Sequence, residues 1–111
     1  GALRAHAAVT TRLGCPVVRN DPRVTEVVRQ VAEAVVGPGR VEEMRPTTGS
    51  DDMAYFLERA PGCYFVVGSS NRARELDGRH HTSRFDFDED ALPVAAKVLG
   101  GAAVRLAAGA G

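Results

Sequence analysis

Residues 63–67 (Cys-Tyr-Phe-Val-Val) constrain the fold more than any other part of this chain. They form an unbroken apolar run rich in aromatic and β-branched types, with a Pro-Gly pair before it and Gly68 after it. Such a run is typical of a central strand, because a strand with one face in water alternates apolar and polar residues. We therefore predict a strand at residues 63–67 that is covered on both faces.

Two stretches with helical periodicity flank this run. Asp21 and Pro22 open the first, because an aspartate suits the N-cap and a proline loses nothing at the first helical position. A Gly-Pro-Gly sequence ends it. The second stretch covers residues 92–106, and we expect Asp90 rather than Asp88 to cap it. The apolar stripe of the first helix consists of valines at helical spacing: Val24, Val27, Val28, Val31 and Val35.

Weaker patterns predict the remaining elements. Residues 3–11 alternate apolar and polar side chains, and residues 41–45 favour a short strand. Ser50 is a suitable cap for a short helix. The order strand, helix, strand, helix, strand, helix predicts an α/β sheet with helices packed on its faces. The apolar face of the short helix would comprise three residues: Met53, Phe56 and Leu57.

Composition limits the partners that this chain can have. The 14 basic and 14 acidic side chains balance, so we expect no binding to nucleic acid or to an anionic membrane. No apolar stretch approaches the roughly 20 residues that span a bilayer, and the first residues do not follow the order of a signal peptide. Cys15 and Cys63 lack the spacing of a metal or redox pair. We expect a soluble, cytoplasmic chain with reduced cysteines.

A polar loop, residues 68–84, follows the predicted central strand and contains His80 and His81. A histidine on a loop that leaves a buried strand suits a metal ligand, because neutral imidazole offers a directed lone pair. Paired histidines on a polar loop with no second ligand in view are, however, more often solvated. The loop by itself leaves both interpretations open.

Residues 78–93 (GRHHTSRFDFDEDALP) resemble the C-terminal signature of the M20 family of amidohydrolases and peptidases. That signature has a histidine, usually a proline two residues on, an aromatic four residues on, then an Asp-Glu pair and a helix. Residues 49–57 and 61–68 are similar to the family's acidic-aromatic helix, its Pro-Gly turn and the next strand, and residues 15–22 to its return from the lid. Ser83 stands where the family usually has proline.

The resemblance implies the C-terminal part of a zinc-peptidase-like catalytic domain, a mixed sheet flanked by helices, preceded by the last strand of the lid. Residues 1–14 would end the lid or dimerisation domain, and residues 15–111 would form the C-terminal portion of the catalytic domain. Family members are commonly homodimers through the lid. They hydrolyse small amide substrates such as N-acyl amino acids.

The resemblance also implies a pair of divalent metal ions, zinc or manganese, that activate a bridging water. His81 matches the family's last metal ligand, and His80 does not. Asn20 matches a position near the substrate, although an asparagine in an Asn-Asp-Pro turn needs no such role. The other ligands and the general-base glutamate belong to a part of the family that this sequence does not contain, so we expect the isolated chain to be inactive and unable to hold the two metals.

Two other interpretations remain open. The chain would be a noncatalytic association module if it kept part of the fold in order to bind a partner. It would be a decayed coding segment if it failed to fold at all.

Overall fold

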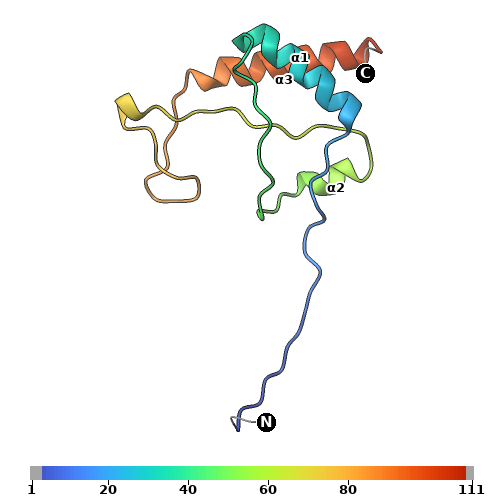
Figure 1. The fold of residues 1–111 in the computed structure, drawn as a ribbon, viewed down its shortest axis with the longest axis vertical. Helices are drawn as coiled ribbons and strands as arrows, with labels where there is room; N and C mark the ends of the chain where they lie inside the picture. The colour runs from blue at the N-terminus through green and yellow to red at the C-terminus, as the bar shows by residue number, and fades with distance from the viewer. Residues whose placement is uncertain (1–3, 110–111) are drawn as a thin grey trace.

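The computed structural model of this chain describes residues 4–109. Within that range the elements are helix α1 (Pro22–Val36), helix α2 (Met53–Leu57), the 3-10 turn η1 (Arg72–Arg74) and helix α3 (Ala91–Ala107). The described residues contain no strand, and an isolated bridge joins Asn71 to Leu76. Helices α1 and α3 lie side by side at one end of the molecule, and the other segments extend from them (Figure 1). None of the helices in residues 4–109 is long and apolar enough to cross a membrane.

Helix α1 begins and ends as its sequence predicts. The Asp21 carboxylate accepts hydrogen bonds from the backbone N–H groups of Arg23 and Val24, both at 3.0 Å, and Pro22 occupies the first helical position. Gly37 follows the last turn with φ of 89°, a conformation that side chains with a Cβ rarely adopt. The predicted N-cap and stop of this helix are therefore confirmed.

The core lies between α1 and α3. Its centre comprises Val28, Val98 and Ala102, of which Val98 is only 2% exposed. The helices approach closely because α3 has a glycine at the contact: a Cβ on Gly101 would lie 2.8 Å from Cγ1 of Val31. The partly buried apolar side chains around this centre are Val24, Ala32, Val35, Cys63, Phe65 and Val94.

Within the described part of the chain, residues 63–67 differ from the predicted central strand in two respects. No strand forms there, and only one face is covered, since Cys63 and Phe65 pack against the helix pair while Tyr64 and Val66 are 39% and 59% exposed. A strand needs a neighbour that accepts and donates backbone hydrogen bonds. The described residues supply no such neighbour, so the segment is extended but unpaired.

The strands predicted at residues 3–11 and 41–45 also do not form within the described range. Residue 3 lies outside that range. Residues 4–14 are exposed and extend away from the rest of the chain, with Val9 at 87% exposure (Figure 1). Alternation specifies a strand only where one face has a surface to cover it, and here it has none.

The short helix α2 forms, but Ser50 is not its cap. Asp52 occupies the N-cap position, and the Asp51 carboxylate accepts the hydrogen bond of the Met53 N–H at 2.8 Å. An acidic side chain beside the first turn thus replaces the serine. Its predicted apolar face is partly wrong as well, because Phe56 is 68% exposed; Ala54 is the buried residue, and Met53 and Leu57 are half-buried.

Candidate functional site: the histidine loop

Residues 78–85, the segment that contains His80 and His81, form a loop on one side of the molecule, at some distance from α1 (Figure 1). Their ring centroids are 4.1 Å apart, and the His80 ring meets the ring of Phe85 edge-on at 4.8 Å. Both histidines are exposed. His81 has φ of 65°, in the left-handed region that non-glycine residues seldom occupy and that is enriched at functional sites.

Local hydrogen bonds and a close backbone approach shape this tip. The carbonyl of Arg79 accepts from the backbone N–H and the hydroxyl of Thr82, at 3.2 and 2.7 Å, and the Phe85 N–H donates to the Thr82 carbonyl at 3.0 Å. Where this tip joins the rest of the loop, a Cβ on Gly78 would clash with the carbonyl oxygen of Arg84. Only glycine fits at position 78 in this arrangement.

Asp88 joins the two ends of the loop. Its backbone N–H donates to the Ser69 carbonyl at 2.8 Å, and its carboxylate accepts from Asn71 Nδ2 at 2.6 Å and from the Arg74 guanidinium at 3.0 Å. The hydrogen bond from Asn71, then that from the Asp90 N–H, and the charge of Arg74 lower the pKa of the Asp88 carboxyl. Asp90 is the N-cap of α3, as predicted, but its side chain makes no capping hydrogen bond.

Sequence reasoning missed the roles of Gly78, Asn71 and Asp88. The available signal was local: Asn71 and Asp88 flank residues 72–87, and such side chains commonly hydrogen-bond nearby backbone in turns. Their pairing with each other depends on how the loop closes, which no spacing rule specifies.

The described residues do not form a metal site by themselves. Within residues 4–109 no three histidine, cysteine, aspartate or glutamate side chains gather where they could hold one ion. The His80 ring lies against the rings of His81 and Phe85. A single imidazole does not hold a metal, since protein metal sites use three or four protein ligands. The prediction that His81 is a ligand stays a prediction.

Asn20, the predicted substrate-binding residue, lies in a different cluster. Its Nδ2 donates to the Tyr64 carbonyl at 2.9 Å and its Oδ1 accepts from the Tyr64 N–H at 2.8 Å, so its carboxamide pairs with both backbone groups of one residue. The neighbouring Asp21 N–H donates to the Gly62 carbonyl at 2.8 Å. The Tyr64 hydroxyl donates to the Asp51 carboxylate at 3.1 Å, and this hydrogen bond raises the pKa of Tyr64. Asn20 thus acts here as a side-chain substitute for a strand neighbour.

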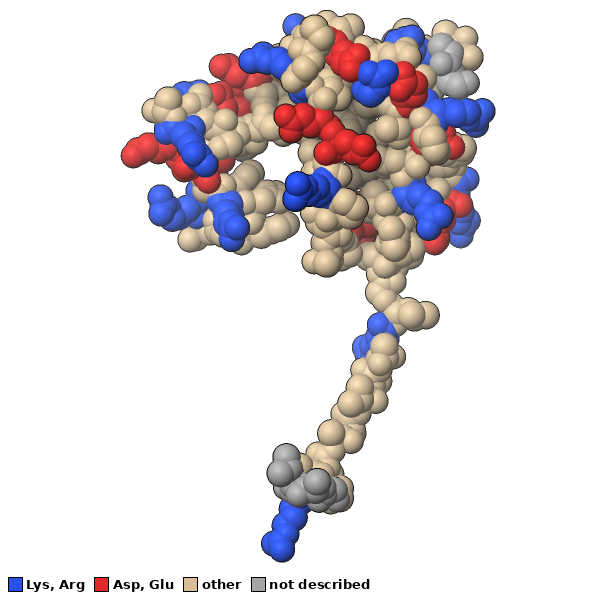
Figure 2. Space-filling view, in the orientation of Figure 1, with Lys and Arg blue, Asp and Glu red and all other residues tan. Residues whose placement is uncertain are grey.

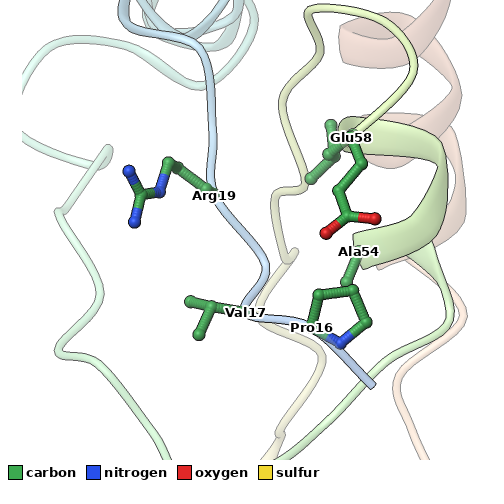
Figure 3. A pocket seen from close by; sticks show the side chains of 6 residues that line it. Pro16, Val17, Arg19, Ala54 and Glu58 are labelled. Atoms are coloured by element: carbon green, nitrogen blue, oxygen red, sulfur yellow. The ribbon is translucent and has the colours of Figure 1, made fainter. Parts of the chain in front are cut away.

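A shallow pocket lies beside this cluster, between the segment that leads into α1 and helix α2 (Figure 3). Its wall is mostly apolar, and Arg19 extends away from α2 (Figure 3). The pocket is lined by no histidine or cysteine, and Glu58 is its single carboxylate, so its lining does not supply the three or four ligands of a metal site. It is lined by Pro16, Val17, Arg19, Ala54, Leu57 and Glu58.

Charges of both signs are spread over the body of the molecule. Basic and acidic side chains are interspersed over the visible face of the body (Figure 2). This distribution agrees with the formal net charge of zero. The visible face of the body therefore carries no broad electrostatic field of one sign.

Comparison with known proteins shows what this chain is related to. The family model for peptidase family M20/M25/M40 matches residues 6–105. The chain is 36% identical over 95 residues to the putative amidohydrolase YhaA of Bacillus subtilis, covering 86% of this chain and 24% of that protein. It is 35% identical over 81 residues to thermostable carboxypeptidase 2 of Saccharolobus solfataricus, covering 73% of this chain and 20% of that protein.

A further relative is the N-acetyl-L-cysteine deacetylase of Bacillus subtilis, 33% identical over 107 residues, which cover 95% of this chain and 24% of that protein. No solved structure matches the chain. The chain spans about a quarter of the length of the curated relatives it matches, or less. The family match extends over nearly all of its residues, including both the Asn20 cluster and the histidine loop. This chain belongs to peptidase family M20/M25/M40, a family of amidohydrolases and peptidases.

Proposed function

We propose that this chain is the C-terminal part of the catalytic domain of a metal-dependent amidohydrolase that cleaves N-acyl amino acids or similar amides. The observation that carries the proposal is the His80–His81 loop: an exposed histidine pair with His81 in a left-handed conformation, inside the region matched by the family. The relatives are named for amide or peptide hydrolysis and for deacetylation, which favours a hydrolase over a noncatalytic association module.

In this proposal His81 is one metal ligand and His80 is its neighbour, which packs against Phe85. The family generally uses divalent metal ions. We propose zinc or manganese as the metal, with the remaining ligands and the general base supplied by a part of the protein outside this chain. Because residues 4–109 do not gather three ligands, the chain alone would neither hold the metals nor hydrolyse an amide.

We further propose that residues 63–70 become a strand of a mixed sheet when the rest of the catalytic domain is present. Support comes from their alternating exposure: residues 63, 65, 67 and 69 are half-buried, whereas residues 64, 66, 68 and 70 are exposed. Asn20 already bonds both backbone groups of Tyr64, and Asp88 bonds the Ser69 carbonyl, so a neighbouring strand would pair with the remaining backbone groups of this extended segment.

Residues 1–14 would be the end of the lid, and residues 15–111 part of the catalytic domain. Support comes from the exposure of residues 4–14 and from the contact of Cys15, whose Sγ lies 3.5 Å from the Asp52 carboxylate. In the complete enzyme the lid would carry a homodimer contact, and the Asn20 carboxamide would stand near the substrate.

A chimera tests the role of His81. The corresponding segment of the Bacillus subtilis putative amidohydrolase, to which the chain is 36% identical, is replaced by this chain. Amide hydrolysis of N-acetyl amino acids and bound metal per protomer are then measured. We expect His81→Ala to remove activity and to lower the metal content, whereas the matched control His80→Ala retains metal. A His81→Ala chimera with full metal content and activity would refute the assignment.

A further inference from the structure

We propose that Asn71, Arg74 and Asp88 form a clasp that keeps the histidine loop closed and so positions the His80–His81 pair. The proposal rests on the proposed function only for the chemical role of His81. The positioning itself is a property of this chain and is open to test without activity.

The clasp stands where the loop leaves and rejoins the body. Residues 72–87 run out between Asn71 and Asp88, whose side chains meet with an Nδ2–Oδ2 distance of 2.6 Å. The backbone of the two ends is joined next to this contact, where the Asp88 N–H donates to the Ser69 carbonyl at 2.8 Å. One side-chain hydrogen bond and one backbone hydrogen bond therefore lie next to each other and join the two ends of this loop.

The Asp88 carboxylate is used on both oxygens. Oδ2 accepts from Asn71, while Oδ1 accepts from the Arg74 guanidinium at 3.0 Å and from the Asp90 N–H at 3.1 Å. Arg74 is the last residue of η1, on the part of the loop that leaves the body, and Asp90 is the N-cap of α3. One carboxylate thus ties the outgoing arm of the loop to the start of α3, and hence to the helix pair.

A pair of backbone hydrogen bonds also links residues 71 and 76, in the part of the loop that leaves the body. Asn71 and Leu76 exchange two backbone hydrogen bonds, Asn71 N–H to Leu76 carbonyl at 2.8 Å and the reverse at 2.9 Å. Further along the chain, the backbone at Gly78 passes so close to Arg84 that a Cβ at position 78 would clash with the Arg84 carbonyl. His80 and His81 lie beyond both the Asn71–Asp88 contact and the Gly78–Arg84 approach, and both are exposed. These two contacts, and not burial, therefore set their position.

Loss of the clasp should therefore release the tip without unfolding the helix pair. Removing the hydrogen bonds that close a loop increases the conformational freedom of the loop residues, and such local opening does not require the core to unfold. The core residues Val98 and Ala102 lie between α1 and α3 and make no part of the clasp. Loop order and core order are thus separable in one experiment.

The test is nuclear magnetic resonance and amide hydrogen exchange on the full 111-residue chain, comparing Asp88→Ala with the control Asp77→Ala, which changes an exposed carboxylate of the same loop outside the clasp. Because the His80 ring lies 4.1 Å from the His81 ring and 4.8 Å from the Phe85 ring between centroids, we expect the His80 ring protons of the parent chain to show ring-current shifts. We expect Asp88→Ala to move them to random-coil positions and to speed exchange of the Leu76 and Phe85 amides roughly tenfold or more. The amides of α1 and α3 should keep their parent values, and Asp77→Ala should match the parent throughout.

Unchanged His80 shifts and unchanged loop exchange in Asp88→Ala would overturn the clasp. If Asp88→Ala disorders the helices as well, Asn71→Ala, which removes one side-chain bond to the carboxylate, is measured with the same two readouts. Faster loop exchange with intact helix signals then supports the clasp, and parent-like loop exchange overturns it. A clasp supported in this chain together with an unaffected His81→Ala chimera would refute the proposed function alone.

Discussion

The pair Gly100 and Gly101 in α3 offers a sharp measurement of how closely the two helices pack. Both are helical glycines next to each other, so replacing either by alanine removes the same entropic penalty, about 1 kcal/mol of helix stability. Their surroundings differ. A Cβ on Gly100 meets nothing within 4 Å, whereas a Cβ on Gly101 would lie 2.8 Å from Cγ1 of Val31, which is 7% exposed.

Gly100→Ala should therefore raise the free energy of unfolding by about 0.5–1 kcal/mol. Gly101→Ala has the same propensity gain, but the contact is too short for two carbon atoms. Val31 cannot easily rotate away, because a valine in a helix strongly prefers one rotamer. Overpacking of this kind costs about 1–3 kcal/mol, so Gly101→Ala should be less stable than Gly100→Ala by about that amount.

Urea denaturation followed by circular dichroism at the helix band measures both variants, and the double variant Val31→Ala/Gly101→Ala completes the test. Removing the Cγ atoms of Val31 should relieve the clash, so the two substitutions should couple favourably. Equal stabilisation by Gly100→Ala and Gly101→Ala would show that α1 and α3 are farther apart than described. Additive effects in the double variant would refute the contact with Val31.

Three further predictions concern single residues. Asp21→Ala removes the carboxylate that caps α1 at Arg23 and Val24, and should lower the free energy of unfolding by about 1 kcal/mol in the same urea assay, whereas an unchanged midpoint would exclude the cap. Asn20→Ala removes both side-chain bonds to the Tyr64 backbone and should speed exchange of the Tyr64 amide, while parent-like exchange would show that the pairing contributes nothing. The pKa of the Asp88 carboxyl is lowered in the folded chain. The ionised carboxylate therefore stabilises the loop fully above the ordinary pKa of 3.8, and this stabilisation is lost as the pH falls through the lower pKa of the folded chain. Amide exchange in the loop should accelerate only in that acidic range, and Asp88→Asn should abolish this pH dependence.

The helices were predictable from the sequence because their signals are local. A cap, a proline at the first position and a valine stripe specify α1 within one segment, and Asp90 was correctly placed before α3. The clasp was not predictable in the same way. Asn71 and Asp88 meet only after the intervening loop has closed, and the fit of Gly78 against Arg84 depends on that same closure.

The segment 63–67 shows a different kind of limit. Its apolar run correctly indicates an extended segment that packs against the helices, since Phe65 contacts the core. The same run also requires cover on its other face, and Tyr64 and Val66 lack that cover in the described part of the chain. The hydrophobic pattern of a segment indicates how many of its faces are buried in the complete fold. The other segments of this chain cover one of the two faces of residues 63–67. Since this chain spans about a quarter of its relatives, the exposed face of residues 63–67 is where the remainder of the catalytic domain would pack under the proposed function.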